Sequence, residues 1–272
     1  MSTASVTSST TEDRALLDAV VAAAHAAGDR LLAIYSTDAR PTGRGDMFTA
    51  GRRNEKASLA GLREALEAAR PGAGWVAEEQ ETTELPAGEW WTVDAVEGSV
   101  NHVHGMGEWC VSITLIRDGA PVLTVVRQPV GDLTYTAVRG GGAHLNDIPL
   151  HVSPKTELNA AIVATGQAEA EQTDTYRRIG ESITAMLGSA LLVRATVPST
   201  FPMLLVAAGH NDVFWQYEPV LPGVAAGVLL ITEAGGIATR IDGSPWRPGS
   251  PDILVATPAL HQPAGAVLAT VA

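Results

Sequence analysis

Carboxylate side chains follow two short apolar runs of this sequence. Glu78 and Glu79 end the first run, and Asp94 ends the second, with Glu97 three positions later. Because α/β folds place their sites at strand ends, these acids are candidates to gather a hard cation. The other interpretation is a solvated acidic loop, and the spacing alone leaves both interpretations open.

The residues after Glu97 extend this candidate site. Gly98 and Ser99 open a predicted short helix, and the backbone N–H groups at a helix start bind anions such as phosphate. Two histidines follow, and either has the side chain of an acid–base catalyst. We include His102 among the catalytic candidates and favour a structural role for His104.

Apolar patterns predict the elements that position these residues. A helical stripe runs from a capping box at residues 9–12 to about Tyr35, and a second helix is predicted from about Asn54 to Ala69, after a polar stretch at 37–53. Strand patterns cover residues 75–77, 91–93, 109–116, 122–126 and 133–138. Alternating strands and helices are then predicted at 161–165, 173–187, 191–195, 203–209, 213–217, 223–234 and 253–256.

The change from hairpins to strand–helix alternation divides the chain into two halves. We expect a flexible head at residues 1–12 and an N-terminal α+β half at 13–155 that holds the antiparallel sheet and the acidic site. A C-terminal α/β half follows at 156–272, and we expect the halves to form one compact unit. The fold class is therefore α+β or α/β.

Composition excludes several classes of protein. With 18 basic and 30 acidic residues the formal net charge is -12, which argues against nucleic acid or an anionic membrane as partner. We find no signal-peptide pattern and no apolar stretch near the ~20 residues of a membrane span. The single cysteine, Cys110, excludes an internal disulfide framework and fits a reducing compartment. We expect a cytoplasmic protein that acts on a small molecule, with Cys110 as a buried apolar side chain.

Four blocks of the sequence resemble the inositol monophosphatase family. Residues 77–79 are similar to its Gly-Glu-Glu, and 94–105 to its Asp-Pro-Ile/Leu-Asp-Gly-Thr-x-Asn-Phe-x-His-Gly. Residues 140–146 are similar to its Gly-x-Gly-Ala-x-x-Asn, and 225–236 to its last helix and turn. The resemblance implies a five-layer αβαβα sandwich of the inositol monophosphatase/fructose-1,6-bisphosphatase type, a homodimer, and two or three Mg²⁺ ions that activate water against a phosphate ester.

The resemblance also implies roles for single residues. Glu78, Asp94, Glu97 and the carbonyl of Val96 stand at metal-ligand positions, although the family has aspartate where Glu97 stands. Ser99 replaces a threonine that orients the attacking water. Gln216 replaces a glutamate that often contacts the sugar, and the other expected substrate-binding residues are Gly98, Ser99, Asn101, Arg52, Asn54, Trp215 and Tyr217.

Other positions depart from the family. Its last helix starts with Trp-Asp, whose aspartate binds the second metal, whereas this chain has Pro222-Gly223. The family's Thr-x-x-Asp motif is lost as well. Alignment on the motif places Arg52 at the position of the aspartate, whereas counting back from Pro71 places Asn54 there. Residues 197–202 differ from its Gly-Ser-Ala-Ala-x-Asp. Losing the second metal and the acid lowers the expected rate of hydrolysis by many orders of magnitude.

Three carboxylates in one pocket need cations, protons or solvent. The cation that balances them would be a single Mg²⁺, the guanidinium of Arg52 or Arg53, or a cationic substrate. Alternatively, the carboxylates share a proton, which raises the pKa of one acid and makes it a general acid.

Our leading hypothesis is an enzyme of small-molecule metabolism whose catalytic residues are Glu78, Asp94, Glu97, Ser99 and His102. It would use acid–base or single-metal chemistry, such as elimination, cyclisation or isomerisation. One alternative is a Mg²⁺-dependent phosphomonoesterase for an inositol, sugar or nucleotide phosphate, with Glu79 or Glu218 supplying the missing ligands. A non-catalytic metabolite-binding homologue is the third.

Overall fold

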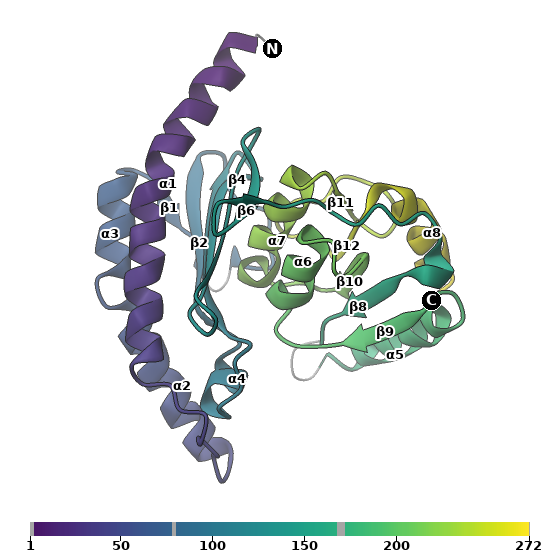
Figure 1. Ribbon diagram of the computed structural model, residues 1–272, viewed down its shortest axis with the longest axis horizontal. Helices are drawn as coiled ribbons and strands as arrows, with labels where there is room; N and C mark the ends of the chain where they lie inside the picture. Colours follow the sequence, from purple (N-terminus) through teal and green to yellow (C-terminus); the bar gives the residue numbers. More distant parts are fainter. Residues whose placement is uncertain (1–2, 78–79, 168–171, 272) are drawn as a thin grey trace.

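Two β-sheets alternate with three layers of helices in the computed structural model of this chain, which describes residues 3–77, 80–167 and 172–271. Figure 1 shows the layers from one side to the other: α1 with α2 and α3, the first sheet, α6 with α7, the second sheet, and α5 with α8. The predicted αβαβα sandwich is therefore confirmed. Within the described residues, every helix is too short or too polar to cross a lipid bilayer.

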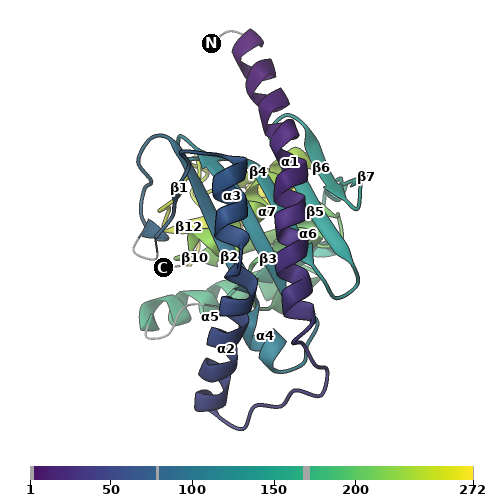
Figure 2. The same cartoon turned by 90° about the vertical axis from the view of Figure 1, so that its left-hand side faces the viewer.

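The first sheet has seven strands in chain order. Only β1 and β2 run parallel, and the other neighbouring pairs are antiparallel. Helix α1 covers one face of this sheet, as the side view in Figure 2 shows. Its residues Val20, Ala27 and Leu31 belong to the same apolar cluster as Trp91 and Ile113. The strands are β1 (Gly74–Trp75), β2 (Glu89–Glu97), β3 (Cys110–Arg117), β4 (Ala120–Gln128), β5 (Leu133–Val138), β6 (Gly142–Leu145) and β7 (Ile148–Pro149).

The second sheet has five strands in the order β11-β12-β10-β8-β9. β8, β9 and β10 run parallel, while β12 is antiparallel to both β10 and β11. The chain passes from the first sheet to the second between residues 150 and 161, which include the expected boundary near 155. The strands are β8 (Ile162–Thr165), β9 (Leu192–Ala195), β10 (Val213–Tyr217), β11 (Ile237–Thr239) and β12 (Asp252–Ala256).

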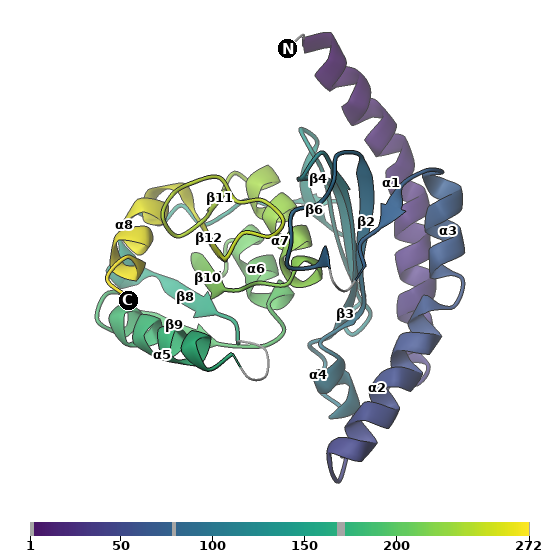
Figure 3. The same cartoon turned by 180° about the vertical axis from the view of Figure 1, so that it is seen from behind.

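Helices α6 and α7 lie between the two sheets, and the view from behind in Figure 3 shows them in the middle layer. Every residue of α7 from Leu221 to Ile231 is buried, because a helix between two sheets is apolar all round. The helices are α1 (Thr3–Leu32), α2 (Arg44–Leu59), α3 (Leu62–Ala69), α4 (Ser99–Val103), α5 (Thr173–Leu187), α6 (Thr200–Ala207), α7 (Leu221–Glu233) and α8 (Pro258–Leu268), with a 3₁₀ turn η2 (Leu158–Ala160).

Several predicted boundaries are wrong. α1 begins at Thr3, so the capping box at 9–12 lies inside it, and residues 3–12 of the expected flexible head are helical. α2 begins at Arg44, although its glycines and polar residues predict a loop up to Arg53. Contacts with α1, α4 and β2 stabilise this helix despite its weak helix propensity. β2 continues through Asp94 to Glu97, beyond the expected strand.

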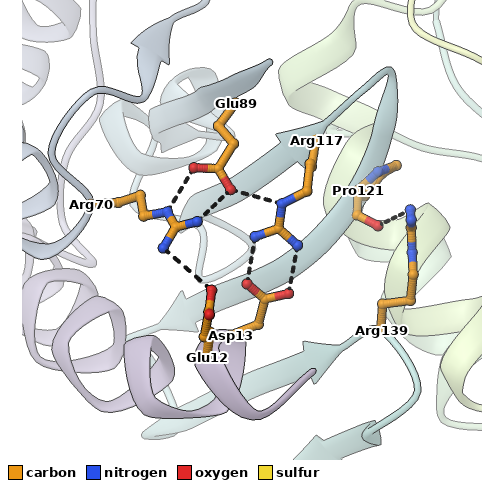
Figure 4. A network of polar contacts seen from close by, with 7 residues as sticks. All are labelled: Glu12, Asp13, Arg70, Glu89, Arg117, Pro121 and Arg139. Atoms are coloured by element: carbon orange, nitrogen blue, oxygen red, sulfur yellow. Dashed lines mark hydrogen bonds and ion pairs between the residues drawn. The ribbon is translucent and has the colours of Figure 1, made fainter. Parts of the chain in front are cut away.

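Four charged side chains link the N-terminal helices to the first sheet (Figure 4). Arg117 on β3 donates two hydrogen bonds to Asp13 on α1, of 2.9 and 2.7 Å, and a third of 2.7 Å to Glu89. Arg70 at the end of α3 donates to both carboxylate oxygens of Glu89 at 2.6 and 2.8 Å. The hydrogen bond from Arg70 is the main cause that lowers the pKa of Glu89, and Arg117 lowers it further. The network therefore fixes α1, α3, β2 and β3 to one another.

We expect Asp13→Asn to lower the free energy of unfolding by about 3 kcal/mol, measured by urea denaturation. The Asp13 side chain is 4 % exposed, and removing its charge leaves Arg117 with Glu89 as its remaining acid, which Arg117 shares with Arg70. Loss of one charge from a buried ion-pair network is strongly destabilising. The control is Glu181→Gln, which removes the solvent-exposed pair with Arg177 and should change stability by less than ~0.5 kcal/mol. A similar small effect of both variants would contradict the structural role of the network.

Candidate functional site

A β-bulge near the end of β2 brings Asp94 and Glu97 together. In a regular strand, residues three positions apart face opposite sides of the sheet. Here Asp94 pairs with Ser112 and Glu97 with Cys110, so β2 contains one residue more than β3 over this interval. The extra residue turns Glu97 back toward the side of Asp94. The predicted pairing of the two acids therefore depends on an irregular strand.

The carboxyl group of Glu97 lies in the interior, between the end of β2 and the starts of α6 and α7. Glu97 is 6 % exposed, and its Oε1 accepts a hydrogen bond of 3.3 Å from the backbone N–H of Thr200. Burial raises the pKa of Glu97 well above its ordinary value, and the charge of Asp94 and a hydrogen bond with Asp94 raise it further. The environment of Glu97 thus favours its protonated form.

A cavity of about 290 Å³, which we call the polar cavity, opens next to Glu97. Ser199 donates a hydrogen bond of 2.6 Å to Oε1 of Gln216 in its wall. Ser99 and Gln167 also border it, and Glu97 is the only ionisable side chain among its described lining residues. Hydroxyl and amide groups recognise hydroxyl groups by hydrogen bonding. The polar cavity is therefore suited to a polyhydroxylated molecule.

A second cavity, of about 450 Å³, adjoins the polar cavity at Ser99 and Val220. We call it the acidic cavity, since Glu55, Glu81 and Asp94 border it. Its one basic lining side chain among the described residues is Arg63, whose guanidinium lies 4.2 Å from the centre of the Trp75 ring. Arg63 also pairs with Glu67 at 3.8 Å, and the expected Arg52 and Arg53 border neither cavity.

The residues after Glu97 form the turn between the two cavities. Gly98 has a φ of 82°, and a side chain there would lie 2.6 Å from the carbonyl oxygen of Glu108, so glycine is required at this position. Ser99 borders both cavities, whereas Val96 borders the acidic one. Asn101 donates to the carbonyl oxygens of Glu108 and Val197 at 2.8 and 3.3 Å, so its amide holds two loops together.

The predicted catalytic role of His102 does not fit its surroundings. Its Nδ1 is 2.9 Å from the Asn54 amide nitrogen, and its Nε2 is 3.2 Å from the Leu31 carbonyl oxygen. The ring packs on Tyr35 and Trp109, and neither cavity includes His102 among its lining residues. Burial lowers the pKa of His102. His102 and Asn54 therefore join α2, α4 and the end of α1.

The remaining expected residues are placed as follows. Arg52 is exposed on α2 and borders neither cavity, and Arg53 donates to Asn54 at 3.4 Å. Trp215 is buried on the other face of the second sheet, with its Nε1 donating to Ser182 at 2.9 Å. Tyr217 packs in the same cluster, beneath Arg178. Only Gln216 of the β10 candidates borders the polar cavity, while Glu78 and Glu79 lie outside the described residues.

Sequence reasoning missed several residues of the site. Thr200 is fully buried, binds Glu97 through its N–H and donates its hydroxyl to the Gly223 carbonyl at 3.0 Å. Ser199, Gln167, Glu55 and Glu81 also border the cavities. The departure of residues 197–202 from the family motif was the signal for Ser199 and Thr200. The helical spacing of Gly51, Glu55 and Leu59 would have indicated Glu55.

The two-ion arrangement of the family does not fit this donor set. Among the described residues, no three His, Cys, Asp or Glu side chains are grouped to hold a metal ion. Gly223 offers no side chain, and Glu97 is turned toward Thr200. Asp94 accepts a hydrogen bond of 2.9 Å from the Val96 N–H, and a cation at its carboxylate would compete with the hydrogen bond to Glu97. Among the residues that the structure describes, Asp94 and the Val96 carbonyl could hold one Mg²⁺.

The layered fold with acids at the end of β2 defines a protein of the inositol-phosphatase structural class. The chain matches the model of the Inositol monophosphatase family over residues 12–271 and belongs to that family. It is 36% identical over 192 residues to an inositol-1-monophosphatase of Rhizobium meliloti (strain 1021), covering 70% of this chain and 72% of the relative. A putative Nus factor SuhB of Neisseria meningitidis serogroup B is 32% identical over 200 residues, or 72% of this chain and 76% of that protein.

Solved structures agree with this assignment. An inositol monophosphatase from Anabaena (Nostoc) sp. PCC 7120 superposes with a TM-score of 0.79 and 26% identity, covering 96% of this chain and 98% of that one. The suhB protein of Bartonella henselae gives a TM-score of 0.75 at 27% identity, over 94% of this chain and 99% of the other. The predicted family is confirmed.

We expect Glu97→Gln to stabilise the metal-free protein at pH 7–8 by about 1 kcal/mol, the scale of a desolvated polar group. An acid whose pKa is raised by folding ionises first in the unfolded chain, so it lowers stability as pH rises above its ordinary value of 4.5. Urea denaturation in EDTA at several pH values measures the effect, which should vanish below about pH 4. A stabilisation that is independent of pH would contradict this assignment.

Proposed function

We propose that this protein is an enzyme that binds a small polyhydroxylated molecule in the polar cavity and uses Asp94 and Glu97 as its acid–base pair. One observation carries the proposal: the bulge in β2 brings Asp94 to the side of Glu97, whose buried carboxyl group faces a cavity with no other ionisable lining side chain among the described residues. Two contacting carboxyl groups hold a proton between them, and such a pair suits proton transfer.

The roles of the individual residues follow from their positions. Protonated Glu97 would donate its proton to a departing oxygen of the substrate in the polar cavity. The Asp94 carboxylate, which borders the acidic cavity, would accept a proton from the substrate where the two cavities adjoin at Ser99. Ser199, Gln216, Gln167 and Ser99 would orient the hydroxyl groups. An elimination, cyclisation or isomerisation needs this combination of an acid, a base and an orienting shell.

Magnesium would have a limited part in this chemistry. A single Mg²⁺ held by Asp94 and the Val96 carbonyl, with Glu78 as a further expected ligand, would neutralise negative charge on a substrate. The second position of the family requires the side chain that Gly223 lacks. Ion-assisted stabilisation of the leaving oxygen contributes several kcal/mol to phosphoryl transfer, so we expect phosphate hydrolysis to be weak or lost.

A working phosphomonoesterase is the second candidate, favoured by the names of relatives such as the Rhizobium meliloti protein. Glu218, one of the residues expected to replace a missing ligand, accepts a hydrogen bond of 2.7 Å from Thr175 at the start of α5. Glu55 and Glu81 in the acidic cavity are better placed for that role. A non-catalytic binding protein is the third candidate, and the Nus factor names of some relatives favour it. Homodimer formation and a cytoplasmic location stay predictions.

We expect the purified protein with 5 mM Mg²⁺ to release phosphate from myo-inositol 1-phosphate very slowly, and the double variant Glu97→Asp/Gly223→Asp to be at least ~10-fold faster. A Cβ atom at Gly223 would lie 3.8 Å from Val220 Cγ2 and 3.9 Å from Glu97 Oε1, so the aspartate fits once Glu97 is shortened. Released inorganic phosphate is the measurement.

The matched control is Glu97→Asp/Gly223→Asn, which has the same shape at position 223 but lacks the second carboxylate. It should stay as slow as the unmodified protein. Rapid phosphate release by the unmodified protein, with two Mg²⁺ bound per chain in calorimetry, would overturn the proposal in favour of the phosphomonoesterase.

A further inference from the structure

A third cavity of about 270 Å³ adjoins the polar cavity on the side of the second sheet. It shares Gln167 and Val197 with the polar cavity, and Ile179 and Ala195 border it. None of its described lining side chains carries a charge at neutral pH. We call it the side pocket. Its apolar character contrasts with the hydrogen-bonding groups of the polar cavity.

The topology of the second sheet explains where the side pocket lies. β8 ends at Thr165, which pairs with Ala195 at the end of β9 and with Trp215 near the end of β10. Ligands of α/β proteins bind beyond the carboxyl ends of parallel strands. The residues that follow β8 and β9 form one side of the pocket, and Ile179 on α5 contributes to the other. Figure 1 shows α5 beside these strands.

Gly166 stands at the junction of the polar cavity and the side pocket. A Cβ atom at this position would lie 2.9 Å from Gln216 Oε1 and 2.9 Å from Ser199 Oγ. Both atoms belong to the hydrogen bond in the wall of the polar cavity. Any side chain at position 166 would therefore displace that pair.

The side pocket exposes apolar surface beside a polar site. Val197 is 47% exposed and Tyr176 is 44% exposed, and ligand pockets combine an apolar lining with a small number of polar groups. A cavity of about 150 Å³ in a protein interior accommodates benzene, and the side pocket is larger. A small polyol alone would leave this surface in water.

We propose that the substrate carries an apolar group the size of an aromatic ring, which the side pocket binds while the hydroxylated part occupies the polar cavity. This inference rests on the proposed function, because it adds a second contact for the same substrate. The ligand class is thus an aryl- or similarly substituted polyol rather than a free inositol or sugar.

The test compares Kd values, measured by ligand-observed NMR, of methyl β-D-glucopyranoside, phenyl β-D-glucopyranoside and benzyl alcohol. Ala195→Phe fills the side pocket from an exposed position at the end of β9. The matched control is Ala266→Phe, an exposed position on α8. We expect the phenyl glucoside to bind about tenfold tighter than the methyl glucoside, and we expect Ala195→Phe alone to abolish this advantage and the binding of benzyl alcohol.

The outcomes separate this inference from the function on which it rests. Equal Kd values for the two glucosides would overturn the inference that the side pocket binds an aryl group, while leaving the proposed polyol site intact. Tighter binding of the phenyl glucoside that persists in Ala195→Phe would do the same. Binding of benzyl alcohol that Ala195→Phe abolishes, without binding of either glucoside, would support the side pocket and count against the proposed polyol substrate. Failure of all three probes to bind would count against both.

Discussion

A carboxyl group in the protein interior must be protonated, paired with a cation or hydrogen bonded. Glu97 faces this requirement at the point where the first sheet meets α6 and α7, and its described partners are the Thr200 N–H and Asp94. Three features set the environment of the Glu97 carboxyl group: the bulge in β2, the buried Thr200 and the uncharged wall of the polar cavity. The chemistry available to the site follows from how that requirement is met.

Positions 97 and 223 both depart from the family pattern. The family has aspartate at both places, whereas this chain has a longer acid at one and glycine at the other. The Glu97 carboxylate reaches to within 3.9 Å of the place where a Cβ of residue 223 would lie. Lengthening one side chain and removing the other thus keeps a carboxylate in this region while reducing the number of negative charges. A cavity with fewer charges attracts fewer cations.

Much of the fold could be predicted from the sequence, and parts of the site could not. β5, β10 and α5 match their predicted ranges, because their apolar patterns are regular. Successive side chains of a strand point to opposite faces of the sheet. In β10, Gln216 borders the polar cavity and Trp215 therefore packs on the outer face. The expectation that Trp215 binds substrate overlooked this alternation. The bulge between Asp94 and Glu97 leaves no local pattern, and the contact of Thr200 with Glu97 joins residues 103 positions apart. Long-range contacts of this kind depend on the whole fold.

Glu89 and Glu97 are the first and last residues of β2, about 26 Å apart at the usual rise per residue. If β2 slid by one residue along β3, Trp91 would leave the α1 side, and both carboxylates of the site would change faces. Glu89 would also lose Arg117, its cross-strand partner. The ion pairs of Glu89 at one end of β2 thus hold the strand in the register that places Asp94 and Glu97 at the other end. A substitution at the Glu89 end can therefore displace these two carboxylates without contacting them.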